Sequence, residues 1–361
     1  MDLVKSGFRP VFPAPPRAAP PQAPVLRRSG ALFLVWWAVL TGCGKIPPAR
    51  SEFVLGTVCI VNLYREGTAP LYGAVFARLR EIEGRMSANA ADTEVARINR
   101  YAGVAPVPVS GEVLTVLSAA LRYAELSGGA FDPTVGPLVK LWGIGTEHAR
   151  IPAEGEIRGA LGLVNWRDVI IDTAAGTVFL PKAGMELDLG AIAKGYAADE
   201  AAALIKGAGI SGALIDLGGN IYALGSKGKG APWRIAVQDP LDARGVYIGV
   251  LELGEKSVVT SGVYERFLEA GGRRYHHILS TADGYPADRG LLSVTVIADA
   301  SIDADALSTA LFVLGYEEGR SLVDSLENVE ALFVFQDLSI RGTPGALEHF
   351  TLAGGRYRIL R

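Results

Sequence analysis

The segment SIDADALSTALFVLG, residues 301–315, places two hard oxygen donors at helical spacing. If it forms a helix, Asp305 and Thr309 project from the same face, one turn above the other. A carboxylate and a hydroxyl on one face suit Mg²⁺ or Ca²⁺ and suit zinc poorly. A structural explanation is also available, in which Asp303 and Asp305 favour the helix N-terminus and Thr309 packs. Such pairs are common, so the pattern alone favours the structural explanation.

A second segment, MELDLGAIAKGYAADE at residues 185–200, could bind an anion. Asp188 stands just before an expected helix, and Gly190 allows close approach to free backbone N–H groups. Lys194 could add positive charge toward a phosphate. The alternative is that Asp188 is an N-cap and Lys194 a solvated helix charge. The segment lacks the GxxxxGK[ST] spacing, so a Walker-type nucleotide site is not supported.

The loop GGAFDPTVGPL, residues 128–138, joins a double-glycine helix stop to two prolines, which predicts an ordered conformation. Phe131 could offer a flat face to a heterocycle. Taken by itself, the pattern favours a loop anchored in the core.

Two of the chain's four histidines are adjacent in RRYHHILSTADGYP, residues 273–286. On a strand, Tyr275, His277 and Leu279 share one face, and His276, Ile278 and Ser280 share the other. The two imidazoles therefore cannot both point into one site. One of them is a candidate general base near neutral pH, and the other is expected to be structural.

The elements that must position these segments mix helices and strands. Strands cluster in runs rather than alternating strictly with helices, which predicts an α+β fold rather than a doubly wound sheet. No repeat or low-complexity linker interrupts the chain, so one domain is expected. Periodicity predicts strands at 53–64, 213–217, 221–224, 233–237, 247–253, 257–260, 275–279 and 292–298, and helices at 71–82, 113–124, 191–206 and 303–314, before a final helix-strand stretch.

Composition is that of a globular protein, with 49% apolar and 20% charged residues. The formal net charge is −3, and no basic run is interleaved with aromatic residues. Nucleic acid is therefore not an expected partner.

The first 43 residues have the order of a bacterial signal segment. Arg27 and Arg28 precede the apolar run 31–40, which is too short to span a bilayer, and Leu40-Thr41-Gly42-Cys43 follows. LTGC resembles a lipobox, in which Cys43 is acylated and becomes the first mature residue. We expect a signal peptide at 1–43, a tether at 44–52, and a membrane-anchored protein facing the periplasm or another extracytoplasmic space. Only Cys59 would remain as a thiol, so no intramolecular disulfide is expected.

Six segments together resemble the ApbE family, the FAD:protein FMN transferases. They occur in the family's order: MSANAADTEVARIN from 86, GGAFDPTVGPLVKLWGIG from 128, DLGAIAKGYA from 188, DLGGNIYALG from 216, VVTSGVYERF from 258, and YHHILSTADGYP from 275 followed by SVTVIADASIDADALSTAL. The resemblance implies a T-fold-like ApbE domain over residues 53–361, which binds FAD and Mg²⁺. Such enzymes cleave the FAD pyrophosphate, pass FMN to a threonine hydroxyl of a partner flavoprotein, and release AMP.

The resemblance also implies a role for each site residue. Asp305, Thr309 and the backbone carbonyl of Ala191 match the metal ligands, and His277 matches the base that activates the acceptor hydroxyl. Positions matching FAD contacts are Met86, Asn89, Ala130, Phe131, Asp132, Asp188, Lys194, Arg266 and Ile278. The acceptor is expected to carry its threonine in a DGxxSAT-like segment.

Three positions depart from the family pattern. Asn89 replaces a common aromatic residue, Ser280-Thr281 replaces the usual Asp-Pro, and Asp283 replaces a threonine. Losing the ring at 89 would loosen the hold on FAD, while an amide there could admit another metal or a water. Two alternative functions therefore stand beside the transferase: a Mg²⁺-dependent FAD pyrophosphatase giving FMN and AMP, and a non-catalytic FAD-binding lipoprotein.

Overall fold

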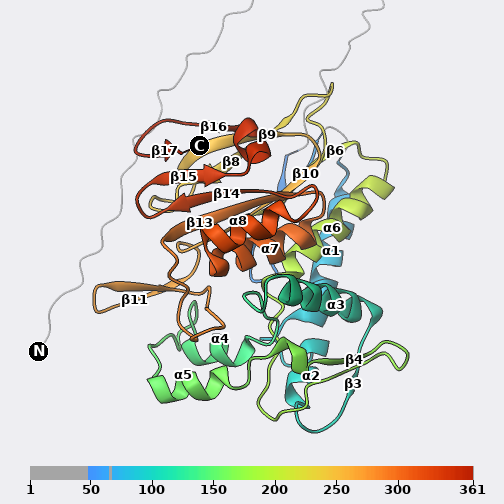
Figure 1. The fold of residues 1–361 in the computed structure, drawn as a ribbon. Helices are drawn as coiled ribbons and strands as arrows, with labels where there is room; N and C mark the ends of the chain where they lie inside the picture. The colour runs from blue at the N-terminus through green and yellow to red at the C-terminus, as the bar shows by residue number, and fades with distance from the viewer. Residues whose placement is uncertain (1–47, 65–66, 361) are drawn as a thin grey trace, which may run out of the picture. The chain divides into compact units, whose positions relative to one another are not determined.

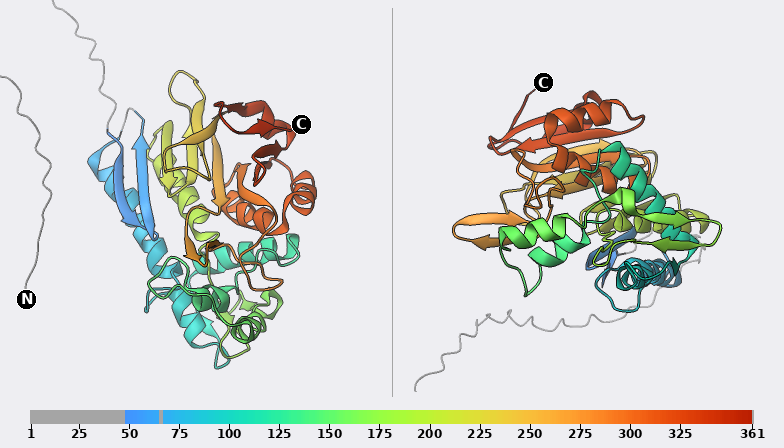
Figure 2. Two further views of the ribbon diagram at one scale, coloured as in Figure 1. Left: turned by 90° about the vertical axis from the view of Figure 1, so that its left-hand side faces the viewer. Right: turned by 60° about the horizontal axis from the view of Figure 1, so that its bottom comes forward.

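A nine-stranded sheet organises the protein in the computed structural model, which describes residues 48–64 and 67–360 (Figure 1). All neighbouring strands are antiparallel except β15 and β17, which pair in parallel. The blue N-terminal hairpin and the red C-terminal strands lie at opposite ends of the sheet (Figure 2). The strand order is β1 (Arg50–Val54), β2 (Thr57–Leu63), β6 (Gly212–Leu217), β7 (Asn220–Gly225), β10 (Lys256–Gly262), β13 (Leu291–Ala298), β14 (Glu330–Phe335), β15 (Ser339–Gly342) and β17 (Arg358–Ile359).

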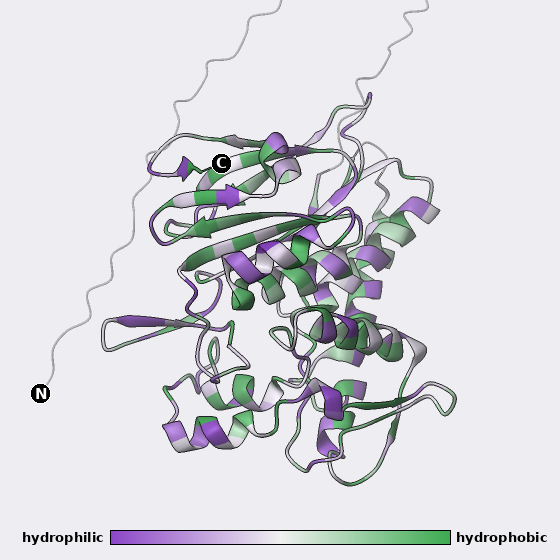
Figure 3. Ribbon diagram, viewed as in Figure 1, coloured by the Kyte–Doolittle hydropathy of each residue, from purple (hydrophilic) through white to green (hydrophobic). Residues whose placement is uncertain are grey.

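The central strands of the sheet are buried on both faces, whereas β1 and β2 expose one face. In β10, Val259 packs toward the helices and Val258 toward a small sheet on the other side. Every residue of β13 is buried for this reason, and Figure 3 shows β13 and β14 as largely hydrophobic. The small sheet consists of β16 (Phe350–Leu352), β9 (Tyr247–Leu253) and β8 (Trp233–Gln238), with α9 (Pro344–His349) beside it. Such double coverage produces continuous apolar runs rather than alternation.

Helices cover the other face. α6 (Ala193–Gly207) and α7 (Ser301–Leu314) lie directly on β6, β7, β10 and β13, with α1 (Ala69–Met86) against α6 and α8 (Tyr316–Asp324) against α7. The remaining elements are α2 (Glu94–Arg100), α3 (Gly111–Leu126), α4 (Gly136–Trp142), α5 (Glu154–Leu161), the 3₁₀ turn Trp166–Asp168, the sheet of β3 (Val107–Pro108), β5 (Thr177–Phe179) and β4 (Ile170–Asp172), and the ribbon of β11 (Phe267–Ala270) and β12 (Arg273–His276).

The predicted α+β class is confirmed, and three boundaries are corrected. The strand expected over 53–64 is a hairpin, because Leu55 and Gly56 adopt positive φ angles of 56° and 68° and turn the chain. The sheet already begins at Arg50, inside the stretch predicted as a tether. The strand expected over 275–279 ends at His276.

Part of the sequence-based prediction lies outside the described residues. The signal segment 1–43, its lipobox and Cys43 belong there. Among the described residues, no helix is long and apolar enough to cross a membrane.

Candidate active site

Asp305 connects α7 to the first turn of α6. Its side chain is only 4% exposed; Oδ2 accepts a hydrogen bond from the Gly195 N–H at 2.9 Å, and Oδ1 lies 3.3 Å from Lys194 Nζ. Position 195 must be glycine for the helices to approach this closely, because a Cβ there would lie 2.4 Å from the Ser301 carbonyl oxygen. Asp305 thus joins α7 to α6 in addition to any effect on its own helix N-terminus.

The carbonyls before α6 face the same region. In a regular helix the Gly195 N–H would donate to the Ala191 carbonyl, but here it donates to Asp305. Within the described residues the Ala191 carbonyl accepts no hydrogen bond. Lys194 Nζ lies 3.0 Å from the Gly190 carbonyl oxygen as well as near Asp305, so an ammonium group already sits among oxygen ligands.

Thr309 lies one turn beyond Asp305 and is half-buried. Its hydroxyl is 3.4 Å from Ser261 Oγ at the end of β10, and Ser261 Oγ is 2.9 Å from Ser308 Oγ. No cluster of three or more His, Cys, Asp or Glu side chains that could hold a metal exists in the described chain. A cation here would need mixed ligands, and one carboxylate, one hydroxyl and a free carbonyl are the hard donors that suit Mg²⁺. The residues present thus fit the predicted metal.

The two histidines contact different parts of the chain, although the strand from which their divergence was predicted ends at His276. His276 is buried, its Nε2 is 3.0 Å from the Ala287 carbonyl oxygen, and its Nδ1 accepts from the Ile278 N–H at 3.3 Å. Its ring also packs edge-on against Phe312. Both nitrogens are therefore satisfied, and His276 has a structural role.

His277 keeps one nitrogen available. Its Nδ1 lies 3.2 Å from the Arg266 carbonyl oxygen, which can only accept, so Nδ1 carries the proton, and Nε2 has no partner among the described residues. Burial, aided by the Arg266 and Lys194 charges, lowers the pKa of His277 from 6.5 to about 3. The imidazole is consequently neutral near pH 7, which is the form that can accept a proton.

Arg266 lies between this histidine and the loop after α4. The aliphatic part of its side chain passes over Gly145, where a Cβ would lie 2.8 Å from Arg266 Cδ. Gly145 has a φ of 90°, so glycine is required there for both backbone and space. The guanidinium remains exposed and available to an anion.

The loop at 128–138 is anchored through Asp132. Its Oδ1 accepts from the Thr134 N–H at 2.8 Å and hydroxyl at 2.6 Å, and its Oδ2 accepts from the Trp166 N–H at 3.0 Å. Phe131 is 3% exposed and belongs to the core, so its ring presents no open face. The expectation of an anchored loop is confirmed. Any contact of these residues with FAD would involve the backbone, with Ala130 as the more accessible neighbour.

The other positions matched to FAD differ in exposure. Met86 and Ile278 are buried in the core, whereas Asn89 is exposed and its N–H donates to Ser87 Oγ. Asp188 is half-buried and accepts from the Gly190 N–H at 2.7 Å, so it orders the turn before α6.

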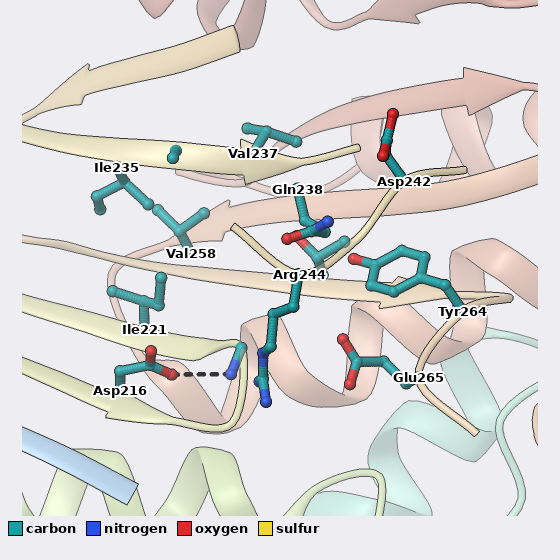
Figure 4. Close-up of a pocket in the computed structure, with 13 residues that line it drawn as sticks. Asp216, Ile221, Ile235, Val237, Gln238, Asp242, Arg244, Val258, Tyr264 and Glu265 are labelled. Atoms are coloured by element: carbon teal, nitrogen blue, oxygen red, sulfur yellow. Dashed lines mark hydrogen bonds between the residues drawn. The ribbon is translucent and has the colours of Figure 1, made fainter. Parts of the chain in front are cut away.

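A cavity of about 340 Å³ lies between the main sheet and β8, and sequence reasoning missed it. Figure 4 shows the Arg244 side chain extending between Asp216 and Glu265, below Tyr264. The side chains of Arg244, Tyr264 and Glu265 form no hydrogen bond or ion pair with other described residues. Desolvation raises the pKa of Glu265 although the residue is exposed, and the charges of Arg244, Arg266 and Lys194 oppose this shift. Its lining comes from strands β6, β7, β8 and β10 and from the loops that follow β8 and β10, and no local sequence pattern joins these residues.

The fold and site together define an α+β protein that gathers a lysine, a buried carboxylate with neighbouring oxygen donors, and a neutral histidine. Such a set is suited to phosphoryl transfer, which needs charge stabilisation and a proton acceptor. A model of the ApbE family matches residues 55–333. The chain belongs to the ApbE family.

Similar proteins align with this chain over most of their length. The FAD:protein FMN transferase of Treponema pallidum (strain Nichols) is 40% identical over 330 residues, covering 87% of this chain and 91% of that protein. A FAD:protein FMN transferase of Klebsiella pneumoniae (strain 342) is 40% identical over 311 residues, covering 86% and 96%. The crystal structure of the ApbE protein from Thermotoga maritima has a TM-score of 0.77 at 34% identity, covering 84% and 98%. The flavin transferase ApbE from Vibrio cholerae has a TM-score of 0.71 at 30% identity, covering 80% and 94%.

Proposed function

We propose that this protein transfers FMN from FAD to a threonine hydroxyl of a partner flavoprotein, with AMP as the other product. The observation that carries the proposal is His277, a neutral imidazole with a free Nε2, within the electrostatic influence of Lys194. The family and its FAD:protein FMN transferase relatives support the same reaction.

The residues supply what the reaction requires. His277 Nε2 accepts the proton of the threonine hydroxyl as its oxygen bonds to the phosphorus of the FMN half. The bond from that phosphorus to the AMP oxygen breaks, and AMP leaves with the electron pair. Lys194 and the exposed Arg266 offset the charge of the pyrophosphate. Asp305, Thr309 and the Ala191 carbonyl would hold Mg²⁺, which when bound stabilises negative charge on phosphate oxygens.

The test is to incubate the purified protein with FAD and Mg²⁺, with and without a flavoprotein domain that carries a DGxxSAT-like threonine segment. Mass spectrometry follows FMN on the acceptor, and chromatography follows free FMN and AMP. We expect acceptor labelling that is lost when the acceptor threonine is replaced by valine. An unlabelled acceptor would contradict the proposal.

Hydrolysis of FAD to FMN and AMP is a second candidate, favoured by Asn89. Its side chain is exposed and offers no stacking surface, which leaves room for a water. Asn89→Tyr should lower FMN release in the absence of acceptor several-fold, whereas Glu327→Tyr, at an exposed position elsewhere, should not. Unchanged release in Asn89→Tyr would remove the reason for this candidate.

We also propose that Cys43 carries a lipid that anchors the protein at an extracytoplasmic membrane face. The order of basic residues, apolar run and LTGC supports this. The full chain expressed in bacteria with a labelled fatty acid should incorporate label and sediment with membranes. Cys43→Ala should lose both properties, and retention of the label in that variant would contradict the proposal.

A further inference from the structure

The ribbon of β11 and β12 has an open edge beside the candidate base. Among the described residues these two strands pair only with each other. The His277 N–H donates to the Arg266 carbonyl at 3.1 Å, and the register pairs Glu269 with Arg274 and Phe267 with His276. Antiparallel pairs alternate, so these last two pairs are not hydrogen-bonded across the ribbon. The backbone N–H and C=O groups of Arg274 and His276 therefore point away from β11.

A neighbouring segment pairs with the chain beyond β12 and then departs. The Ala287 N–H donates to the Ile278 carbonyl at 2.9 Å, and Leu279 forms a bridge to Pro286. This pairing does not continue alongside His276 and Arg274. A groove of about 230 Å³ lies there instead, between β12 and the segment 286–292. The groove thus takes the place that a third strand would occupy.

We propose that this groove, called the β12 groove, binds an extended segment of the acceptor protein by strand addition. The proposal rests on the proposed transferase function, whose second substrate is a protein. That protein must bring a hydroxyl to His277, and His277 directly follows the last residue of β12. An unpaired strand edge offers alternating donors and acceptors that a peptide backbone matches.

The lining of the β12 groove indicates the side chains that it would accept. Most of its wall is apolar, through Leu241, Val263, Leu291 and Leu292, and one carboxylate, that of Asp288, also lines it. Arg273 also lines it and forms no ion pair within the described residues, whereas Arg274 is paired with Glu269 at 3.0 Å. The groove therefore fits a segment with apolar side chains and an acidic residue placed to meet Arg273 and away from the Asp288 carboxylate.

A pair of proline variants tests the edge directly. Arg274→Pro removes the outward N–H of β12 without removing a bond to β11, a position at which edge strands tolerate proline. Glu269→Pro is the matched control, because it removes the outward N–H of β11 and breaks the same ion pair. We expect Arg274→Pro to raise the KM for the acceptor domain at least tenfold and Glu269→Pro to change it less than twofold. FAD affinity, measured by flavin fluorescence, should stay unchanged in both.

A second pair tests the groove wall without altering the backbone. Leu241 is 46% exposed and lines the groove, and Ile170 on β4 is 52% exposed and does not. Leu241→Asp should raise the acceptor KM by a similar factor, and Ile170→Asp should leave it unchanged.

The outcomes separate this proposal from the proposed function. If the wild-type protein binds FAD but never labels the acceptor, the transferase function fails. If the wild-type protein labels the acceptor while Arg274→Pro and Leu241→Asp keep its KM, the β12 groove is overturned and the transferase stands. If Arg274→Pro and Glu269→Pro raise the acceptor KM equally while Leu241→Asp leaves it unchanged, the proposal is also overturned. Damage to either strand of the ribbon would then have the same effect, and the β12 groove would have no role of its own.

Discussion

The two adjacent histidines differ in what their ring nitrogens contact, and this difference assigns their roles. His276 has both nitrogens engaged by backbone groups of its own surroundings. His277 has one nitrogen fixed by the Arg266 carbonyl and the other free. A carbonyl partner selects the tautomer that leaves Nε2 able to accept a proton, so local backbone geometry prepares the base.

Replacement of His277 by alanine should therefore lower the transfer rate, whereas replacement of His276 should lower stability. His277→Ala should lower the rate of FMN transfer by roughly 10²–10⁴, the usual contribution of a general base, with little change in unfolding temperature. His276→Ala should lower the free energy of unfolding by about 1–3 kcal/mol, because buried backbone groups lose their partners. Transfer kinetics and thermal unfolding of both variants measure this. Equal rate losses in well-folded variants would refute the assignment.

The pH dependence of transfer follows from the lowered pKa of His277. A base is active in its neutral form, and His277 loses that form only as pH falls through about 3. An ordinary histidine would lose it around 6.5. We expect kcat/KM for FAD, which reports the free enzyme, to show no loss attributable to His277 between pH 8 and pH 5. A limb with an apparent pKa near 6.5 that vanishes in His277→Ala would contradict the prediction.

At the scale of elements, α6 and α7 each supply one carboxylate that accepts backbone hydrogen bonds from the other helix. Asp305 on α7 receives the Gly195 N–H of α6, and Asp199 on α6 receives the Ser301 and Ile302 N–H groups of α7 at 2.7 and 2.8 Å. Ala300, the N-cap residue, has no side-chain acceptor, so Asp199 caps α7 from a neighbouring helix. This cap fixes the start of the helix that carries Asp305 and Thr309.

The cap should make stability depend on pH in an unusual direction. Burial raises the pKa of Asp199 from 3.8 to about 6, so the folded protein binds a proton that the unfolded chain has already released. The proton on Asp199 therefore stabilises the folded protein at low pH, and this stabilisation is lost as pH rises through about 6. Between pH 4.5 and 7 the free energy of unfolding of the wild type should fall by about 2 kcal/mol more than that of Asp199→Asn, given the size of the pKa shift. Urea unfolding at both pH values measures this, and parallel changes in the two proteins would contradict it.

At the scale of the whole molecule, the sequence predicted the class of fold and most elements because the apolar periodicity of 113–124 and 303–314 was clear. The hairpin at 53–64 was missed because its two-residue turn places Leu55 at positive φ, and Gly56 alone does not distinguish a turn from a glycine within a strand. The chain's family resemblance is confirmed by the family match and by structures of similar proteins.

Other parts of the site could not be predicted because they depend on long-range contacts. Arg244, Tyr264 and Glu265 meet only when β8 is laid over β10, and nothing near them in sequence indicates a cavity. The hydrogen bond from Gly195 to Asp305 joins residues 110 positions apart. Sequence spacing showed that Asp305 and Thr309 share a helical face, but only packing reveals that Asp305 meets the first turn of α6.

Binding of Mg²⁺ at the proposed site should raise the stability of the folded protein, and this effect should depend on the Asp305 carboxylate. Asp305 is the single charged oxygen donor of the proposed metal site, and Lys194 now offsets its charge. A cation bound only by the folded protein adds about 2.7 kcal/mol at a concentration of 100 times its Kd, which shifts thermal unfolding upward. Asp305→Asn keeps an acceptor for the Gly195 N–H but should lose most of this shift, together with transfer activity. Asp242→Asn, at the rim of the neighbouring cavity, should keep the shift. A Mg²⁺-dependent shift of full size in Asp305→Asn would place the metal elsewhere.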